Sequence, residues 1–451
     1  MAEQVCSVGL DVGTTSTQMV VSRLTVENQA GSFSVPRMQI TRREVVYTSP
    51  VHFTPLLGKD LVDGPELKKI VQSEYEKAGI RPETVDTGAI IITGETSRKE
   101  NAARVLRELE GFAGEFVVAT AGPDLESILA AQGAGAVEYS RKTGKTVLHM
   151  DIGGGTSNLA LIRDGEIVQT GCLNVGGRLV KFDEQGTVTY VSPVLRGLWD
   201  IREGQKADPG VLRQGAEILT SALEMAGGRI PGTPLLDALT TEGTGVPAPS
   251  DNMVISFSGG VADCIEKALP WNVFGDLGPI LGRAIRDSAL CRGEYTLGSE
   301  TIRATVIGAG CHSTQLSGST VFYRNVRFPL KNLPVARIPE SCREPEQVER
   351  YLSGSAWEEK VLIALPEMKL DYMGLRRLGK VLARACPGAV QIAMEQDMAK
   401  ALGQILALEL PRDREILCID RVDLGDRTYL DVGAPLGPAL PVVVKTLVLK
   451  G

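Results

Sequence analysis

Two short stretches of this sequence repeat one pattern 140 positions apart. The first reads VGLDVGTTSTQMVV and the second reads LHMDIGGGTSNLAL. When Asp11 is aligned with Asp151, Gly13 falls on Gly153, and the next four positions pair hydroxyl or glycine residues. Each copy has an apolar run, an aspartate, a glycine-bearing polar turn and a second apolar run, which predicts two strands joined by a turn. The 140-residue spacing is suited to one such hairpin in each of two lobes.

The turn of each hairpin has the composition of a phosphate-binding site. Glycines let backbone N–H groups approach a ligand closely, and threonine and serine hydroxyls add further donors. The expected phosphate-binding residues are Gly13, Thr14, Thr15, Ser16 and Thr17 in the first copy and Gly153, Gly154, Gly155, Thr156 and Ser157 in the second. A lone turn of this kind is equally well explained as a plain hairpin connection. Two copies facing each other would clamp a polyphosphate from both sides, and the glycine-rich second turn is expected to lie closest to the terminal phosphate.

Three carboxylates are candidate catalytic residues. Asp11 and Asp151 each end the first strand of a hairpin, where a carboxylate repels phosphate but can hold Mg²⁺ through water. Glu126 begins a helix rich in small residues, and a carboxylate there could orient an attacking water. A favourable interaction with the helix N-terminus explains this glutamate more simply. The sequence alone therefore assigns Mg²⁺ to the two aspartates and leaves Glu126 open.

A third glycine-rich segment is a candidate for the adenosine part of a nucleotide. Ser258, Gly259 and Gly260 follow a strand-like run and precede a helical one, and glycines there let a flat ring or a ribose lie against the backbone. As a lone signal, this segment is equally well explained by packing. The segment 307–310 has a similar composition and is the alternative.

Composition narrows the classes of partner. The chain has 451 residues, a net charge of −7, 5% aromatic residues and no long basic run, so nucleic acid and anionic membranes are not expected partners. The start of the sequence has no apolar signal segment, and no apolar run is long enough to span a membrane, which predicts a soluble cytoplasmic protein. Eight scattered cysteines and three distant histidines favour neither a disulfide framework nor a metal centre.

The order of predicted elements suggests three segments. Residues 1–140 mix strands and helices around the first hairpin, and residues 141–325 begin again with the second hairpin. Within the second segment, TIRATVIGAG at 301–310 is predicted as a strand. Residues 326–451 alternate strand and helix as βαβαβ, which predicts a small parallel sheet, followed by two more strands.

Taken together, these motifs resemble those of the actin–Hsp70–sugar kinase superfamily. LDVGTTST and MDIGGGTSN resemble its two phosphate motifs, and ISFSGGVADCI resembles its adenosine motif. ESILAAQGAG resembles its first connecting helix and GDLGPILGRAI its second, which adds Gly278 to the expected nucleotide contacts. The resemblance implies an α/β fold of two actin-like, ribonuclease H-like lobes that bind ATP and Mg²⁺, with an additional α/β domain at the C-terminus. Ser127 departs from the proline that Hsp70-like members carry after the glutamate, which puts a catalytic role for Glu126 in doubt.

Within that superfamily, the chain resembles the reactivating factors of ethanolamine ammonia-lyase. YTSPVHFTPL, ITGETSRKENAARVL, RATVIGAGCHSTQLSGST and DVGAPLGPALPVVVKTLVL carry this resemblance, which covers nearly the whole sequence. It implies an ATP-dependent chaperone whose partner is a lyase with adenosylcobalamin as its cofactor, and whose action exchanges damaged cobalamin for intact coenzyme. It also implies a cytoplasmic location, with an ethanolamine-utilisation microcompartment as a possible site.

Two other functions fit the same fold. A small-molecule kinase would need a general base and a polar pocket for the acceptor hydroxyl, and the sequence offers no identifiable base. A nucleotide-controlled cytoskeletal or scaffold protein is the second alternative, and it is disfavoured if tethered to a membrane because no terminal membrane-targeting helix is evident. The C-terminal segment is expected to contact the lyase, because it lies outside the predicted ATPase core.

Overall fold

In a computed structural model of the protein, the first lobe is built on a mixed β-sheet. The structure describes residues 3–13, 16–29, 38–57, 61–92, 105, 109, 117–121, 123–241, 243–248, 252–298, 300–312, 314–318, 320–353, 361–386, 388–422, 424 and 429–445. The main strands of the lobe are β1 (Glu3–Val12), β2 (Ser16–Asn28), β3 (Met38–Thr48), β7 (Thr87–Ile92) and β8 (Val117–Ala121). Their order is β3-β2-β1-β7-β8; β1, β2 and β3 are antiparallel neighbours, while β7 and β8 run parallel to β1. The predicted first hairpin is therefore confirmed as β1 and β2.

Apolar residues on β1, β2 and β7 bury this sheet against helix α1 (Gly64–Ala78). Asp63 caps α1 by accepting a hydrogen bond from the backbone N–H of Glu66, and Gly79 ends the helix in the left-handed region at φ 68°. The segment between β3 and α1 contains β4 (His52–Phe53), β5 (Leu56–Leu57) and β6 (Leu61–Val62), and the 3₁₀ turn Pro82–Thr84 precedes β7.

The second lobe repeats the strand order of the first. Its strands are β9 (Val147–Ile152), β10 (Ser157–Arg163), β11 (Glu166–Leu173), β14 (Val254–Ser258) and β15 (Tyr295–Leu297), in the order β11-β10-β9-β14-β15. Again the first three are antiparallel neighbours, and the last two run parallel to the first. Around this sheet lie β12 (Val180–Phe182), β13 (Val188–Val191), the 3₁₀ turn Pro193–Leu195, α5 (Pro209–Ala226), α6 (Pro234–Leu239), α7 (Asp263–Glu266) and α8 (Gly278–Asp287).

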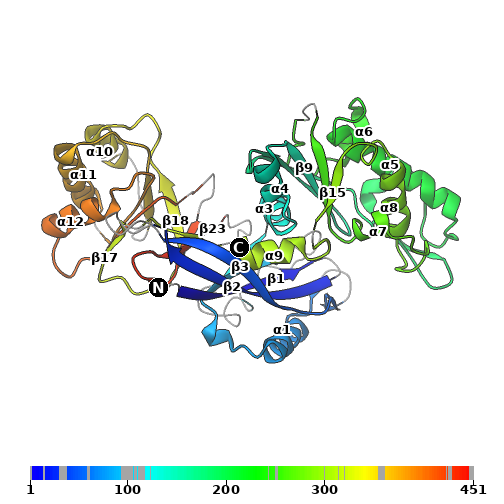
Figure 1. Ribbon diagram of the computed structural model, residues 1–451, viewed down its shortest axis with the longest axis horizontal. Helices are drawn as coiled ribbons and strands as arrows, with labels where there is room; N and C mark the ends of the chain where they lie inside the picture. The colour runs from blue at the N-terminus through cyan, green and yellow to red at the C-terminus, as the bar shows by residue number, and fades with distance from the viewer. Residues whose placement is uncertain are drawn as a thin grey trace.

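Two helices pack together where the lobes meet. They are α3 (Pro123–Gly133), which continues into α4 (Ala136–Thr143), and α9 (Ala304–His312). A Cβ atom on Gly308 would lie 2.0 Å from the carbonyl oxygen of Leu129, and one on Gly133 would lie 1.9 Å from that of Ala304. The two glycines therefore let the helix backbones pack in direct contact. Figure 1 shows α9 lying along the first sheet and facing the second lobe.

Two predictions about this region are wrong. The segment 301–310 was expected as a strand, but residues from Ala304 onward form helix α9, because packing against α3 outweighs the local β-branched composition. The segment GDLGPILGRAI was expected as the second connecting helix, but it contributes α8, which packs on α5 and α7 inside the second lobe. The helix that returns the chain to the first lobe is α9, which contacts β1, β2 and β7.

The C-terminal domain is a third α/β unit. Its sheet has the order β16-β23-β22-β18-β19-β20-β21-β17, and the predicted parallel βαβαβ is confirmed as β19, α11, β20, α12 and β21. The strands are β16 (Gln315–Leu316), β17 (Phe322–Arg324), β18 (Leu330–Arg337), β19 (Leu362–Leu365), β20 (Val390–Met394), β21 (Ile416–Asp420), β22 (Tyr429–Val432) and β23 (Pro441–Lys445). The helices are α10 (Pro345–Ser353), α11 (Tyr372–Ala385) and α12 (Ala399–Glu409). The first strands of this sheet, β16 and β17, lie before the boundary expected at residue 326.

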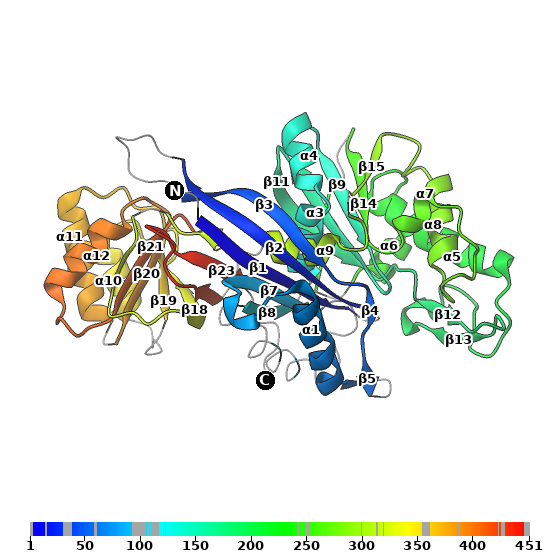
Figure 2. The same ribbon diagram turned by 60° about the horizontal axis from the view of Figure 1, so that its bottom comes forward.

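The first lobe lies between the other two units. Figures 1 and 2 place the C-terminal domain at one end and the second lobe at the other, with β1, β2 and β3 between them. Leu316 of β16 packs against the apolar cluster of Val5, Leu24 and Val26, which joins the C-terminal domain to the first sheet. Within the described residues, none of the helices has both the length and the apolar character needed to cross a membrane.

Candidate nucleotide-binding site

A cleft of about 260 Å³ lies between the two hairpins. Predicted site residues from both lobes line it: Asp11, Gly13, Ser16, Glu126, Asp151, Gly153, Gly154, Gly155, Thr156, Gly259, Gly260 and Gly278. Thr17, Ser157 and Ser258 do not line it and are buried beside it. Thr14 and Thr15, also predicted phosphate contacts, lie outside the described residues.

The two turns close in the same way. The backbone N–H of Gly13 donates to the carbonyl of Ser16 at 2.8 Å, and that of Gly153 donates to the carbonyl of Thr156 at 2.9 Å. These pairs occupy equivalent positions of the repeat, so the sequence similarity corresponds to a shared backbone geometry. Both turns thus close with the same hydrogen bond, and residues of both hairpins line one cleft, as a two-sided phosphate clamp requires.

An amide lies opposite each aspartate, and sequence reasoning missed both amides. Asp11 pairs across its hairpin with Gln18, and Asp151 pairs with Asn158. Both amides line the cleft, and the side-chain oxygens of Gln18 and Asn158 are buried without a hydrogen-bond partner in the described structure. The repeat does carry a signal that marks them, because an amide follows each aspartate by seven positions.

These four side chains fit a hydrated magnesium ion. Mg²⁺ keeps several waters and takes few direct carboxylate ligands, and unpaired amide oxygens can accept hydrogen bonds from such waters. In the part of the chain that is described, there is no cluster of three or more His, Cys, Asp or Glu side chains that could hold a metal directly. Asp11 and Asp151, with Gln18 and Asn158, are therefore suited to hold Mg²⁺ through its water shell.

The first turn is braced from outside by the segment that follows β3. The hydroxyl of Thr54 donates to the carbonyl of Gly13 at 2.7 Å and lies 3.1 Å from the hydroxyl of Thr17. Ser49 anchors the start of this segment, because its hydroxyl accepts a hydrogen bond from the backbone N–H of Met19 at 2.9 Å. A short run of residues after the third strand therefore fixes the position of the first turn.

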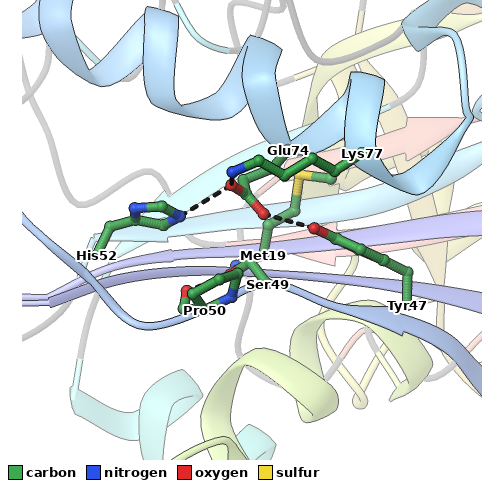
Figure 3. A network of polar contacts seen from close by, with 7 residues as sticks. All are labelled: Met19, Tyr47, Ser49, Pro50, His52, Glu74 and Lys77. Atoms are coloured by element: carbon green, nitrogen blue, oxygen red, sulfur yellow. Dashed lines mark hydrogen bonds and ion pairs between the residues drawn. The ribbon is translucent and has the colours of Figure 1, made fainter.

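A buried carboxylate on α1 holds the same segment in place. Figure 3 shows Glu74 between Tyr47, His52 and Lys77. The Tyr47 hydroxyl donates to one carboxylate oxygen at 2.6 Å, while the other contacts His52 Nε2 at 3.0 Å and Lys77 Nζ at 2.6 Å. Burial alone would raise the pKa of Glu74, but the hydrogen bonds from Lys77, Tyr47 and His52 outweigh it, and the pKa lies below its ordinary value. Glu74 therefore remains charged and ties β3 and β4 to the helix.

The second turn is braced from within its own lobe. The backbone N–H groups of Gly177 and Arg178 donate to the carbonyls of Gly153 and Gly154 at 3.0 and 2.6 Å. A Cβ atom on Gly176 would lie 2.3 Å from the carbonyl oxygen of Gly154, so the loop and the turn approach too closely for any side chain there. This contact between two backbones ties the second turn to a buried loop of its own lobe.

Asp151 is held by a chain of buried polar side chains. Its carboxylate accepts hydrogen bonds from the hydroxyls of Ser258 and Thr305, the latter at 3.3 Å. Ser258 also lies 2.9 Å from His149 Nε2, and Ser256 lies 3.0 Å from Nδ1 of the same ring. With Asp151 ionised, Ser258 donates to it and therefore accepts from Nε2–H, which leaves Nδ1 to accept from Ser256.

The surroundings of these buried polar side chains shift the pKa values of Asp151 and His149 in opposite directions. Burial raises the pKa of Asp151 to about 6, although the hydrogen bonds from Ser258 and Thr305 oppose that rise. Burial also lowers the pKa of His149 to about 3, so the ring is neutral at physiological pH. Asp151 is thus a deeply placed carboxylate that accepts hydrogen bonds from two hydroxyl groups.

The glycines of the predicted adenosine segment, 258–260, differ in position from those of the alternative segment, 307–310. Gly259 has φ 86° and faces the carbonyl of Ile152, so a side chain there would be both strained and obstructed. Gly259 and Gly260 line the cleft, where the backbone is bare. Gly308 and Gly310 do not line the cleft, because they pack against α3 and β1. Of the two segments, 258–260 therefore has the position suited to a nucleoside.

Glu126 lies in the first turn of α3 and lines the cleft between the lobes. It is partly buried, and its position in the cleft lining is compatible with orienting a water beside the phosphates. Arg178 and Asp276 also line the cleft and were missed by the sequence reasoning. Arg178 Nε donates to an Asp276 carboxylate oxygen at 3.1 Å. Asp276 lies in the segment GDLGPILGRAI but was not predicted as a site residue, and no local motif marks Arg178.

Two lobes with the same sheet order, a cleft between paired hairpins and two helices packed where the lobes meet define the class: this is an actin-like ATPase fold. Residues 3–450 match the family described as "Ethanolamine utilisation protein EutA", and the chain belongs to that family.

Curated relatives match along nearly the whole chain. "Ethanolamine ammonia-lyase reactivase EutA" of Salmonella typhimurium is 39% identical over an alignment of 468 positions that covers 98% of this chain and 98% of the relative. The protein of the same description from Escherichia coli is 39% identical over 472 residues, again with 98% of each chain covered. Among solved structures, a Ppx/GppA phosphatase of Aquifex aeolicus is similar with a TM-score of 0.39 and 14% identity, over 68% of this chain and 99% of that one.

Proposed function

We propose that this protein is an ATP-dependent reactivating chaperone of ethanolamine ammonia-lyase. The observation that carries the proposal is the pair of matching turns on one cleft, in a chain whose relatives are described as reactivases of that lyase. The proposed action is the exchange of damaged cobalamin in the lyase for intact adenosylcobalamin. On this proposal the chain works where its target works, in the cytoplasm or within an ethanolamine-utilisation microcompartment.

Different residues of the cleft are proposed to bind different parts of the nucleotide. Backbone N–H groups of the two turns bind phosphate oxygens, and the bare backbone at Gly259 and Gly260 lies along the nucleoside. Asp11 and Asp151 hold Mg²⁺ through water, and bound Mg²⁺ supplies neutralisation of phosphate charge. Glu126 is proposed to orient the water that attacks the terminal phosphate.

The contacts of α9 suggest how nucleotide state reaches the rest of the molecule. Thr305 on α9 donates to Asp151 of the second lobe, while the same helix packs on β1 and β2 of the first. A change at the phosphates that moves Asp151 would therefore shift one lobe against the other. Different affinity for the lyase in the two nucleotide states would then move the lyase toward a form that releases its cofactor.

The C-terminal domain, residues 326–451, is proposed to contact the lyase. At the start of α11, the neighbouring side chains of Tyr372 and Met373 are 67% and 59% exposed, and together they offer apolar surface for a partner. Replacing both with serine is expected to lower reactivation while leaving ATP turnover unchanged. Full reactivation by this double variant would place the lyase contact elsewhere.

The deciding experiment measures the recovery of lyase turnover. Ethanolamine ammonia-lyase is inactivated, then incubated with this protein, free adenosylcobalamin and Mg²⁺, with ATP, ADP or no nucleotide. The proposal expects recovery with ATP that Asp151→Asn abolishes. Recovery that is equal without nucleotide would contradict the ATP-dependent mechanism, and no recovery under any condition would contradict the chaperone function.

A further inference from the structure

The charge distribution of the cleft is unbalanced for a site that binds an anion. The charged side chains among the described lining residues are five carboxylates and one cation: Asp11, Glu126, Asp151, Asp263, Asp276 and Arg178. A polyphosphate entering this cleft meets negative charge on most sides. Mg²⁺ would offset part of it, and the guanidinium of Arg178 is the cation that the described part of the cleft itself provides.

The main chain places Arg178 beside the second phosphate turn. Its backbone N–H donates to the carbonyl of Gly154 at 2.6 Å. Its aliphatic stem covers the same glycine, since a Cβ atom on Gly154 would lie 3.4 Å from Cδ of Arg178. The side chain is 30% exposed, so the guanidinium is partly shielded from water and still reachable from the cleft.

Asp276 fixes the direction of this guanidinium. One carboxylate oxygen accepts from Arg178 Nε at 3.1 Å, and the other accepts from the backbone N–H of Gly278 at the start of α8, at 2.9 Å. Asp276 is 5% exposed, so the pair is shielded on the Asp276 side. An arginine held through Nε keeps its Nη groups for planar contact with a second anion, which is the geometry that binds phosphate oxygens well.

We propose that Arg178 binds the phosphate groups of the nucleotide directly and that Asp276 is its positioning residue. This inference rests on the proposed nucleotide site and assigns the cation that the predicted motifs lack. The contact is made to phosphate and not to adenosine, because the stem of Arg178 lies on the phosphate turn at Gly154.

The test compares ligands that differ in phosphate content. Isothermal titration with Mg²⁺ measures the affinity of wild type and Arg178→Ala for ATP, ADP and adenosine. A charge-assisted hydrogen bond is worth enough that its loss is expected to weaken ATP and ADP about 10- to 100-fold. Adenosine affinity is expected to stay unchanged. Arg202→Ala is the matched control, because Arg202 is an exposed arginine paired with Asp200 in the same lobe and outside the cleft lining.

The outcomes separate this proposal from the proposed function. If Arg178→Ala weakens adenosine as much as ATP, or leaves ATP and ADP unchanged, direct phosphate binding by Arg178 is overturned. If wild type binds no adenine nucleotide, the nucleotide site itself fails. Asp276→Asn is expected to weaken ATP several-fold alone and to add nothing in the Arg178→Ala background, since it acts through that arginine. An equal loss in both backgrounds would overturn the positioning role, and thermal unfolding of every variant checks that it is folded.

Discussion

The two hairpins share a backbone geometry but are supported in different ways. The first turn is held by Thr54, which reaches it from a segment that Glu74 secures on α1. The second turn is held by the backbone of the buried loop at Gly177 in its own lobe. Asp11 is half-buried, whereas Asp151 is 7% exposed and rests on hydroxyl groups. One pattern of residues can therefore give a side-chain-braced turn in one lobe and a backbone-braced turn in the other.

This difference assigns unequal roles to the two aspartates. Asp151→Asn is expected to lower ATP turnover about 100- to 1,000-fold, because it removes a buried charge at the deeper turn while keeping the side-chain shape. Asp11→Asn is expected to lower it about tenfold, because water shields the half-buried charge. Steady-state phosphate release measures both. Wild-type turnover in both variants would contradict the two-sided clamp. Equal losses of turnover in the two variants would contradict the unequal roles of the two aspartates.

The next largest effect concerns the brace of the first turn. Glu74→Gln is expected to lower the free energy of unfolding by about 2–4 kcal/mol, since the donors of Tyr47, His52 and Lys77 lose the charged acceptor that Glu74 provides from a buried position. Urea unfolding measures the change. Glu66→Gln on the same helix is the matched control, because that carboxylate is half-exposed and paired with Lys69, and a change within about 0.5 kcal/mol is expected. Equal effects would show that Glu74 is no special anchor.

The same carboxylate predicts a pH dependence. Because the pKa of folded Glu74 lies below its ordinary value, its contribution to stability is fully present above the ordinary glutamate pKa and is lost as pH falls through the lowered one. The stability difference between wild type and Glu74→Gln should therefore shrink in acid. A difference that grows as pH falls would contradict the direction of this shift.

The support of Asp151 is expected to give a smaller and more selective effect. Ser258→Ala removes the hydroxyl that donates to Asp151 and is expected to lower kcat for ATP about tenfold with little change in ATP affinity. Ser256→Ala is the matched control, because Ser256 contacts the same histidine but has no contact with Asp151 among the hydrogen bonds of the described chain. Equal effects of the two variants would show that the serines serve only packing.

The brace at Thr54 is expected to give the smallest effect. Thr54→Val keeps the shape and removes the hydroxyl that donates to Gly13, so ATP affinity should fall about three- to fivefold. Thr41→Val removes a similar hydroxyl from exposed β3, where it donates to Thr25, and should leave affinity unchanged. If ATP affinity in Thr54→Val falls by as large a factor as kcat falls in Ser258→Ala, the first turn is supported as strongly as the second.

Local sequence patterns predicted the two hairpins. The features that they did not predict, helix α9 and the position of Arg178, depend on contacts between residues far apart in the sequence. The two hairpins and the C-terminal βαβαβ follow from short-range periodicity and turn residues. Helix α9 does not, because Val306 and Ile307 favour a strand and the helix is stabilised by close packing of Gly308 on α3. Arg178 reaches the cleft through a loop whose neighbours are 24 residues away at Gly154 and 98 away at Asp276, so its position could not be read from its own surroundings.

The central claim is that both turns bind the phosphates of one nucleotide. A crystal structure of the protein with Mg²⁺ and a non-hydrolysable ATP analogue tests it most directly. The account predicts phosphate oxygens within hydrogen-bond distance of backbone N–H groups in both turns, and Mg²⁺-bound waters at Asp11 and Asp151. Phosphates bound by one turn alone, or an analogue bound outside this cleft, would contradict the two-sided clamp.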